Sequence, residues 1–195
     1  MSTARELSIA ILAGGAATRL DGRDKGLQVL DGEPLVARLL RALDAKMPVL
    51  IVANRNLDRY AAYAPTITDQ DAVPRGPLAG IAAALAHDTA PWMLTVPVDC
   101  PDPPADLAVR LLAATRVHRE RAFVAHDGER RQPLFALYRR DLARSAAHAA
   151  AMAQGVWQWQ DTVGVRELDF ADRRAHFLNL NTSADFAAYA ERSGE

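Results

Sequence analysis

The sequence predicts an α/β domain with a mostly parallel sheet, and three observations lead to that fold class. Short apolar runs alternate with amphipathic segments through the first half of the chain, which is typical of a parallel sheet covered by helices on both faces. Half of the 195 residues are hydrophobic, so the chain can bury a substantial core. Two apolar runs flank Asp127-Gly128 in the second half and predict an antiparallel hairpin. The expected architecture is a Rossmann-like sheet with helices on both faces and this hairpin in the second half.

The first half begins with an apolar run over residues 7–12 that ends at Ala13-Gly14-Gly15, which predicts a buried strand followed by a turn. Pro34 then opens a helix, because proline is favoured in a first helical turn and the apolar residues after it recur at helical spacing. The apolar face of that helix consists of Leu35, Val36, Leu39, Leu40 and Leu43. The other elements expected in this half are strands over 48–53, 65–68 and 92–96 and helices over 57–63, 76–87 and 105–114.

The second half follows a different pattern. Strands are expected over 122–126 and 133–138, a helix over 141–153, a further strand over 163–168 and a last helix over 182–191. No repeat, linker or low-complexity stretch divides the chain, so residues 1–195 are predicted to form a single domain. Its two halves are expected to cover residues 1 to about 115 and about 116 to 195.

The overall charge excludes two classes of protein. The chain has 23 basic and 24 acidic residues and a formal net charge of -1, whereas nucleic-acid and membrane-surface binders usually carry a strong basic excess. The N-terminal residues contain no hydrophobic signal segment, so the expected location is the cytoplasm. The single cysteine, Cys100, cannot form an internal disulfide or a multi-cysteine zinc site, and we expect it to be a packing residue.

The residues that follow the expected parallel strands are the first place to look for a site, because ligands of open parallel sheets bind beyond the carboxyl ends of the strands. A glycine-rich loop follows the first strand, and its glycines allow backbone N–H groups to approach phosphate oxygens. Arg19 and Lys25 add positive charge to it. Only two of the 23 basic residues are lysines, Lys25 and Lys46, and lysine is a compact charge suited to phosphate. The loop is therefore predicted to bind phosphate, although it is neither a Walker A loop nor a GxGxxG motif.

Asp99 ends the strand expected over 92–96 and its extension through Pro97. A carboxylate at that edge is suited to hold Mg²⁺ against a triphosphate, because Mg²⁺ prefers hard oxygen ligands. The alternative is that Asp99 caps the following helix, and the phosphate-binding loop nearby favours the metal role.

The glycine-rich loop resembles the LAGGxxxRMGGxDKGL loop of the bacterial molybdenum cofactor guanylyltransferases, a family of nucleotidyltransferases related to the sugar-phosphate pyrophosphorylases. It differs from that pattern at Leu20 and Asp21. Further blocks resemble the family in the same order along nearly the whole chain. They are Ala53-Asn54-Arg55, Thr68-Asp69, GPLAG over 76–80, PVDCP over 97–101, HDGER over 126–130 with Gln132-Pro133, and NLNT over 179–182.

The resemblance implies transfer of GMP from GTP to the terminal phosphate of molybdopterin, or of its molybdenum-loaded form, with release of pyrophosphate and with Mg²⁺ as cofactor. It implies catalytic roles for Arg19, Lys25 and Asp99, with Asp99 as the metal ligand. The residues expected to bind GTP are Leu12, Ala13, Gly14, Gly15, Lys25, Asn54, Asp69 and Asp99. Beyond the two substrates, the expected partners are proteins that deliver molybdopterin and apo-molybdoenzymes or their chaperones. The first half of the domain would then bind the nucleotide and the second half the other substrate.

Asp69 and Asp71 are the two candidates for recognition of the base. A carboxylate can accept both the N1–H and the exocyclic amino group of guanine, although an Asp-x-Asp pair is more often an exposed turn. The family's base-reading aspartate lies seven residues before the first glycine of GPLAG, which here is Asp69. The family also has an asparagine at the end of the second strand, where this chain has Val52, and Asn54 follows two residues later.

Four further residues are expected on the side of the second substrate. Gly76 and Gly80 lie at a helix start and belong to the active site in the family, although a turn glycine and a packing glycine would look the same. Asn179 and Asn181 alternate, so in a strand their side chains would share one face and either could contact metal or phosphate. Their alternative role is turn and cap chemistry before Thr182.

Two other functions stay open. One is a cytidylyltransferase or a sugar-phosphate nucleotidyltransferase of the same fold, against which Gly14-Gly15 and Asp24-Lys25-Gly26 favour the guanylyl branch. The other is a non-catalytic carrier of GTP or pterin, and the presence of both Lys25 and Asp99 argues against it.

Overall fold

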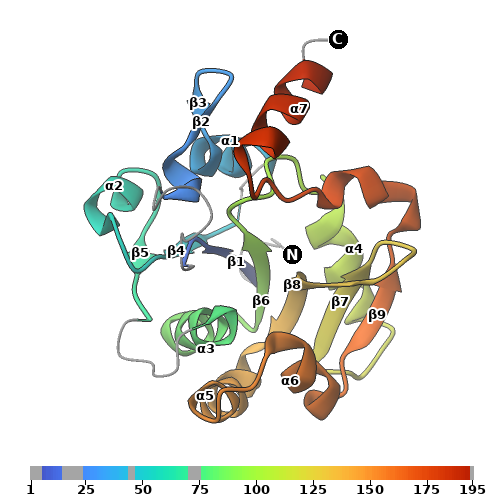
Figure 1. Cartoon of the computed structure of the whole chain (residues 1–195). Coiled ribbons are helices and arrows are strands. Elements are labelled where there is room, and N and C mark those ends of the chain that lie inside the picture. Colours follow the sequence, from blue (N-terminus) through green and yellow to red (C-terminus); the bar gives the residue numbers. More distant parts are fainter. Residues whose placement is uncertain (1–5, 15–23, 44–46, 70–75, 194–195) are drawn as a thin grey trace.

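A computed structural model describes residues 6–14, 24–43, 47–69 and 76–193, and its centre is a seven-stranded sheet (Figure 1). The strand order is β5-β4-β1-β6-β8-β7-β9. The strands are β1 (Leu7–Leu12), β4 (Val49–Val52), β5 (Thr66–Ile67), β6 (Trp92–Pro97), β7 (Ala122–His126), β8 (Arg131–Arg139) and β9 (Arg166–Asp169). Among the described strands of this sheet β8 alone runs against the others, because it pairs antiparallel with both β6 and β7. The predicted fold class is thereby confirmed.

Helices cover both faces of the sheet. Those described are α1 (Leu35–Ala42), α2 (Leu57–Ala61), α3 (Pro77–His87), α4 (Leu107–Ala114), α5 (Ala143–Ala151), α6 (Val156–Val163) and α7 (Ser183–Ser193), with 3-10 turns η2 (Lys25–Leu27), η3 (Arg140–Leu142) and η4 (Ala171–Phe177). Helices α1 and α4 pack on one face, and α3, α5 and α6 pack on the other. The side chains of β1 explain this division, because Ile9 and Ile11 join the first cluster while Ala10 and Leu12 join the second.

The segment before β9 differs from the expectation. A strand was expected over 163–168, but Val163 ends helix α6, and β9 begins at Arg166. The helix was missed although Val156, Trp159 and Val163 recur at helical spacing. It ends at Gly164, whose φ of 72° is the left-handed conformation that favours glycine after a helix.

A small hairpin between the first loop and α1 was also missed. Strands β2 (Val29–Leu30) and β3 (Glu33–Pro34) pair antiparallel around Asp31-Gly32. Both turn residues have positive φ, 52° and 82°, as a tight Asp-Gly hairpin turn requires. Leu30 packs with Leu35 and Leu180 in a separate apolar cluster that docks the C-terminal helix α7 against α1. This docking brings the chain just before α7 next to the loop that carries Lys25.

No helix in the described part of the chain is long and apolar enough to cross a membrane. The cytoplasmic location stays a prediction.

Candidate functional site

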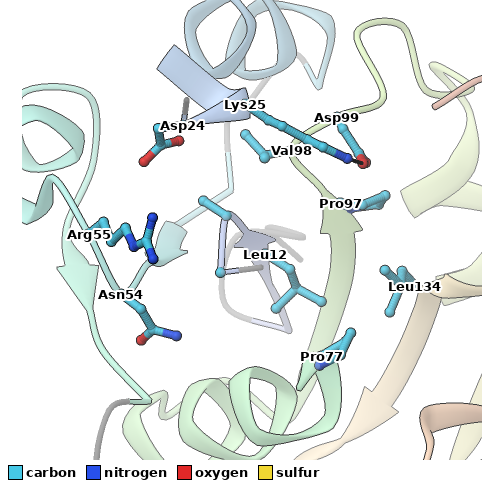
Figure 2. A pocket seen from close by; sticks show the side chains of 12 residues that line it. Leu12, Asp24, Lys25, Asn54, Arg55, Pro77, Pro97, Val98, Asp99 and Leu134 are labelled. Carbon is cyan, nitrogen blue, oxygen red and sulfur yellow. Dashed lines mark hydrogen bonds and ion pairs between the residues drawn. The ribbon is translucent and has the colours of Figure 1, made fainter. Parts of the chain in front are cut away.

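A cleft of about 220 Å³ lies where β1, β4 and β6 end (Figure 2). Backbone hydrogen bonds hold these ends together, since the Ala13 N–H donates to Val52 at 2.8 Å and the Val98 N–H donates to Leu12 at 3.1 Å. The cleft is lined by Leu12, Ala13, Gly14, Asp24, Lys25, Asn54, Arg55, Pro77, Pro97, Val98, Asp99 and Leu134. The cleft lies where the sequence predicts the site, beyond the carboxyl ends of the parallel strands.

The start of the glycine-rich loop forms part of the cleft wall. A Cβ atom on Gly14 would lie 3.2 Å from Asn54 Nδ2, so a side chain there would crowd the amide. Leu12, Ala13 and Gly14 all line the cleft as expected. Gly15 and Arg19 lie outside the described residues.

Lys25 joins two distant parts of the chain at the cleft. Its ammonium donates to Asp99 Oδ2 at 3.1 Å and to Asn181 Oδ1 at 2.6 Å. The side chains of Lys25 and Asp99 are 24% and 18% exposed, so the ion pair is shielded but open to the cleft. Asp99 is held at the edge because it follows β6, and Figure 2 shows the two side chains meeting. Both members of this ion pair were predicted as site residues. Asn181, the other acceptor of the ammonium, was one of two asparagine candidates.

The structure distinguishes Asn181 from Asn179. Residues 178–181 do not form a strand, so the expectation of a shared strand face is wrong. The Leu180 N–H donates to the Asp99 carbonyl at 2.8 Å, and this bond lays the extended segment alongside the residue that follows β6. Asn181 therefore reaches Lys25, whereas Asn179 Oδ1 is buried without a hydrogen-bond partner among the described residues.

Asp185 fixes the backbone of Asn181. Its Oδ2 atom accepts hydrogen bonds from the N–H groups of Asn181 at 2.7 Å and Thr182 at 2.8 Å, and its own N–H donates to Thr182 Oγ1 at 3.2 Å. This reciprocal pattern is a capping box at the start of α7. The N–H of Asn181, more than any other group, lowers the pKa of Asp185. The carboxylate that caps helix α7 therefore also fixes the backbone position of Asn181.

Asn54 and Asp69 lie together on the other side of the cleft. Asn54 Oδ1 accepts from Thr68 Oγ1 at 3.0 Å and from the Asp69 N–H at 3.3 Å, so the amide ties the residues after β4 to those after β5. Asp69 is only 7% exposed, and its Oδ1 atom has no hydrogen-bond partner within the described ranges. Asn54 lines the cleft and Asp69 lies behind it. Asp71 belongs to the residues that are not described.

The two glycines of the GPLAG block occupy different environments. Gly80 is buried in α3, where a Cβ atom would lie 3.5 Å from Asp69 Oδ2, from Leu12 Cδ2 and from Val52 Cγ1. That is ordinary contact distance, so Gly80 faces the sheet and lies beside Asp69. Gly76 is exposed and lines a second hollow between the start of α3 and the segment joining α5 to α6. Pro77 lines both hollows, which are therefore adjacent.

The residues around Lys25 fit a divalent metal. Asp99 Oδ2 and Asn181 Oδ1 converge on one cationic group, the Lys25 ammonium, and both are hard oxygen ligands of the kind Mg²⁺ prefers. In the part of the chain that the structure describes, no group of three His, Cys, Asp or Glu residues could hold a metal. Two protein oxygens leave most positions of a Mg²⁺ ion to water and substrate phosphates, which is the usual arrangement in phosphoryl-transfer sites.

Two charged cleft residues were missed as individual candidates, Asp24 and Arg55. Both residues belong to motifs that resemble the family, and their positions could have identified them. Asp24 precedes Lys25, and Arg55 follows Asn54 at the end of a parallel strand.

Cys100 is buried as expected, and its thiol donates to the His176 carbonyl at 3.2 Å. Burial raises the pKa of the thiol, so the thiol is not a nucleophile.

Comparisons with known proteins agree with this geometry. A model of the MobA-like NTP transferase domain matches residues 9–167. A molybdenum cofactor guanylyltransferase of Vibrio cholerae is 38% identical over 186 residues, covering 94% of this chain and 91% of the relative. One of Burkholderia vietnamiensis is 41% identical over 194 residues, covering 93% and 94%.

Solved structures show the same fold. Molybdopterin-guanine dinucleotide biosynthesis protein A of Archaeoglobus fulgidus superposes with a TM-score of 0.80 at 21% identity, covering 96% of this chain and 98% of that one. A Mycobacterium tuberculosis protein solved with manganese superposes with a TM-score of 0.70 at 15% identity, covering 96% and 99%.

The capping box generates a prediction about pH. We expect Asp185→Asn to lower the free energy of unfolding by about 1 kcal/mol at neutral pH, because the charged cap on two N–H groups is lost. The folded-state pKa of Asp185 lies below its unfolded value. Its contribution is therefore complete above a pH of about 4 and is lost as the pH falls through the folded-state pKa. Urea titrations of both proteins at decreasing pH measure the difference.

Glu191→Gln is the matched control, because Glu191 is an exposed acid near the other end of the same helix. A difference between wild type and Asp185→Asn that stays constant down to the lowest pH would contradict the assignment.

Proposed function

Because the chain belongs to the MobA-like NTP transferase family, we propose that it transfers GMP from GTP to the terminal phosphate of molybdopterin, or of its molybdenum-loaded form, and releases pyrophosphate. The observation that carries the proposal is the ion pair of Lys25 and Asp99 in a cleft at the carboxyl ends of β1, β4 and β6, with Asn181 as the second acceptor of the Lys25 ammonium. This arrangement offers one cation and two hard oxygen ligands to a triphosphate.

In the proposed reaction a phosphate oxygen of the pterin substrate attacks the α-phosphorus of GTP. The new P–O bond forms as the bond from that phosphorus to the bridging oxygen breaks, and the electron pair leaves with pyrophosphate. The nucleophile is already anionic at neutral pH, so the site needs no general base, which agrees with the absence of a histidine from the described residues that line the cleft.

The residues of this chain act on charge and position. The Lys25 ammonium and the N–H groups at the start of the glycine-rich loop stabilise negative charge on the phosphates as it moves toward pyrophosphate. Asp99 and Asn181 would hold Mg²⁺, which when bound neutralises charge on the phosphate oxygens. The Lys25 ammonium contacts the same two oxygens, so a metal ion held by them would replace this contact. Arg19 stays a predicted second cation.

Asp69 is the proposed base-reading residue. Its buried Oδ1 atom lacks a hydrogen-bond partner among the residues described, and its neighbour Asn54 lines the cleft. A buried carboxylate oxygen without a donor is costly, and guanine supplies two adjacent donors. These observations favour guanine over adenine or cytosine, which lack that pair.

The division of the domain into two substrate halves is also part of the proposal. Every cleft residue except Leu134 precedes residue 115, and the second hollow, which Gly76 lines, includes residues of α5 and α6. That hollow is the proposed side of the pterin substrate. Delivery proteins, recipient apo-molybdoenzymes or their chaperones, and the cytoplasm as compartment stay predictions from the resemblance and the sequence.

The direct test is pyrophosphate release with molybdopterin and each of the four ribonucleoside triphosphates. We expect GTP to give the highest kcat/KM. A preference for CTP would assign the chain to the cytidylyl branch instead. Binding of GTP without pyrophosphate release would indicate a carrier.

The metal assignment predicts the effect of Asp99→Asn. We expect this variant to lose roughly 100-fold or more in kcat while it folds normally, because it loses a charged contact to Mg²⁺ that acts on the transition state. Asp102→Asn is the control, since the side chain of Asp102 is 46% exposed and pairs with Arg38 at 3.6 Å. Near-normal turnover of Asp99→Asn at saturating Mg²⁺ would overturn the metal role and leave Asp99 only as a partner of Lys25.

The base-reading assignment predicts a change in nucleotide preference. Asp69→Ala should narrow the ratio of kcat/KM between GTP and ATP by about tenfold or more, because a hydrogen bond to a charged group is worth roughly 1.5–3 kcal/mol. The dependence on Mg²⁺ should not change. Asp71→Ala is the companion variant, and the same narrowing in Asp71→Ala but not in Asp69→Ala would move the assignment to Asp71.

A further inference from the structure

The carboxylate of Asp24, immediately before Lys25, is bound at both oxygens by one helix. Its Oδ1 atom accepts a hydrogen bond from the Tyr60 hydroxyl, and its Oδ2 atom accepts one from Asn56 Nδ2 at 2.9 Å. Figure 2 shows the side chains of Asp24 and Lys25 leaving the chain in opposite directions. Lys25 therefore contacts Asp99 from a backbone position whose preceding residue, Asp24, is bound to α2 on the opposite side.

Asn56 and Tyr60 lie on the same side of α2 and bind the same carboxylate. They lie four residues apart at the start of α2, where side chains at that spacing share a face. The Asn56 carbonyl accepts the Tyr60 N–H at 3.1 Å, so the first turn of the helix sets their spacing. Asn56 has φ 51° and ψ 36°, a left-handed conformation that asparagine tolerates better than most residues. Tyr60 is fully buried, and burial is the main cause that raises the pKa of its hydroxyl, which therefore stays a donor.

Tyr60 also confines the residue after Lys25. A Cβ atom on Gly26 would lie 2.7 Å from Val98 Cγ2 and would overlap the Tyr60 hydroxyl. Residues 24–26 are therefore packed between α2 and Val98, the residue before Asp99. Lysine has a long flexible stem, so its ammonium stays at a fixed place only if the backbone that carries it is held.

We propose that Tyr60 and Asn56 are positioning residues that bind the Asp24 carboxylate by hydrogen bonds and thereby hold the Lys25 ammonium at the cleft. They do not contact substrate themselves. The same connection from β4 to α2 carries Asn54 and Arg55 into the cleft just before Asn56, so it also links the opposite wall of the cleft to the lysine. The inference rests on the proposed function only for its effect on turnover, because the position of the ammonium can be measured without substrate.

The first measurement is the rate at which an acetylating reagent modifies Lys25, followed by mass spectrometry. The chain has two lysines, so Lys46 serves as the internal reference. We compare wild type with Tyr60→Phe, which removes one donor, and with Asn56→Gly, which removes the other while keeping a residue that accepts the left-handed conformation. Tyr63→Phe, a change at an exposed tyrosine just after α2, is the matched control.

We expect the Lys25 rate, relative to Lys46, to rise in both test variants and not in Tyr63→Phe, because a displaced ammonium loses the protection of Asp99 and Asn181. In pyrophosphate release with GTP, kcat should fall roughly tenfold while KM changes less, since misplaced charge costs more at the developing pyrophosphate than in the bound substrate.

A purely structural role would lower the melting temperature of Tyr60→Phe but leave its Lys25 rate and kcat equal to those of Tyr63→Phe, and that result would overturn the inference. The proposed function fails separately. If wild type released no pyrophosphate but the Lys25 rates responded as expected, the positioning role would stand and the activity would not.

Discussion

The Lys25 ammonium ion lies between an oxygen of Asp99 and an oxygen of Asn181, and much of the structure serves to bring these three groups together. They come from the turn after the first loop, the end of β6 and the segment before α7, and no local sequence relation connects them. A partly shielded lysine needs acceptors to offset its lost hydration, and a carboxylate alone would satisfy one of its three donors. The amide of Asn181 provides the second contact without adding a charge that would repel a triphosphate.

Separate contacts position each of the three residues, Lys25, Asp99 and Asn181. Asp99 follows a strand whose end is paired with β1, Asn181 is held by the Asp185 cap, and Lys25 is preceded by Asp24, which α2 binds. Such secondary support is what phosphoryl-transfer sites need, because they act by placing charge rather than by covalent chemistry. The apolar cluster of Leu30, Leu35 and Leu180 has a similar effect at longer range, since it docks α7 against α1.

The other wall of the cleft follows a different principle. There the polar side chains bind each other, as Asn54 does with Thr68 and Asp69, and leave one carboxylate oxygen without a donor in the described part of the chain. Small residues in α3 allow the helix to lie close to β1 and β4, where Gly80 meets Leu12 and Val52. One side of the site therefore carries an ion pair, and the other carries a buried carboxylate oxygen without a donor among the described residues.

The sequence by itself determined the sheet, most helices and the cleft residues Lys25 and Asp99, because these depend on short-range patterns. Periodicity placed β1, β4, β6 and α3, and the carboxyl ends of parallel strands had to meet at one edge. Helix α6 was not predicted, and only its last residue, Val163, was included in an expected strand. Tertiary structure alone decided that Asn181 rather than Asn179 reaches Lys25, because the hydrogen bond from Leu180 to Asp99 and the cap on the Asn181 N–H position this segment beside Lys25. It alone also joined Tyr60 and Asn56 to Asp24 across more than thirty residues of chain, a contact that no spacing in the sequence encodes.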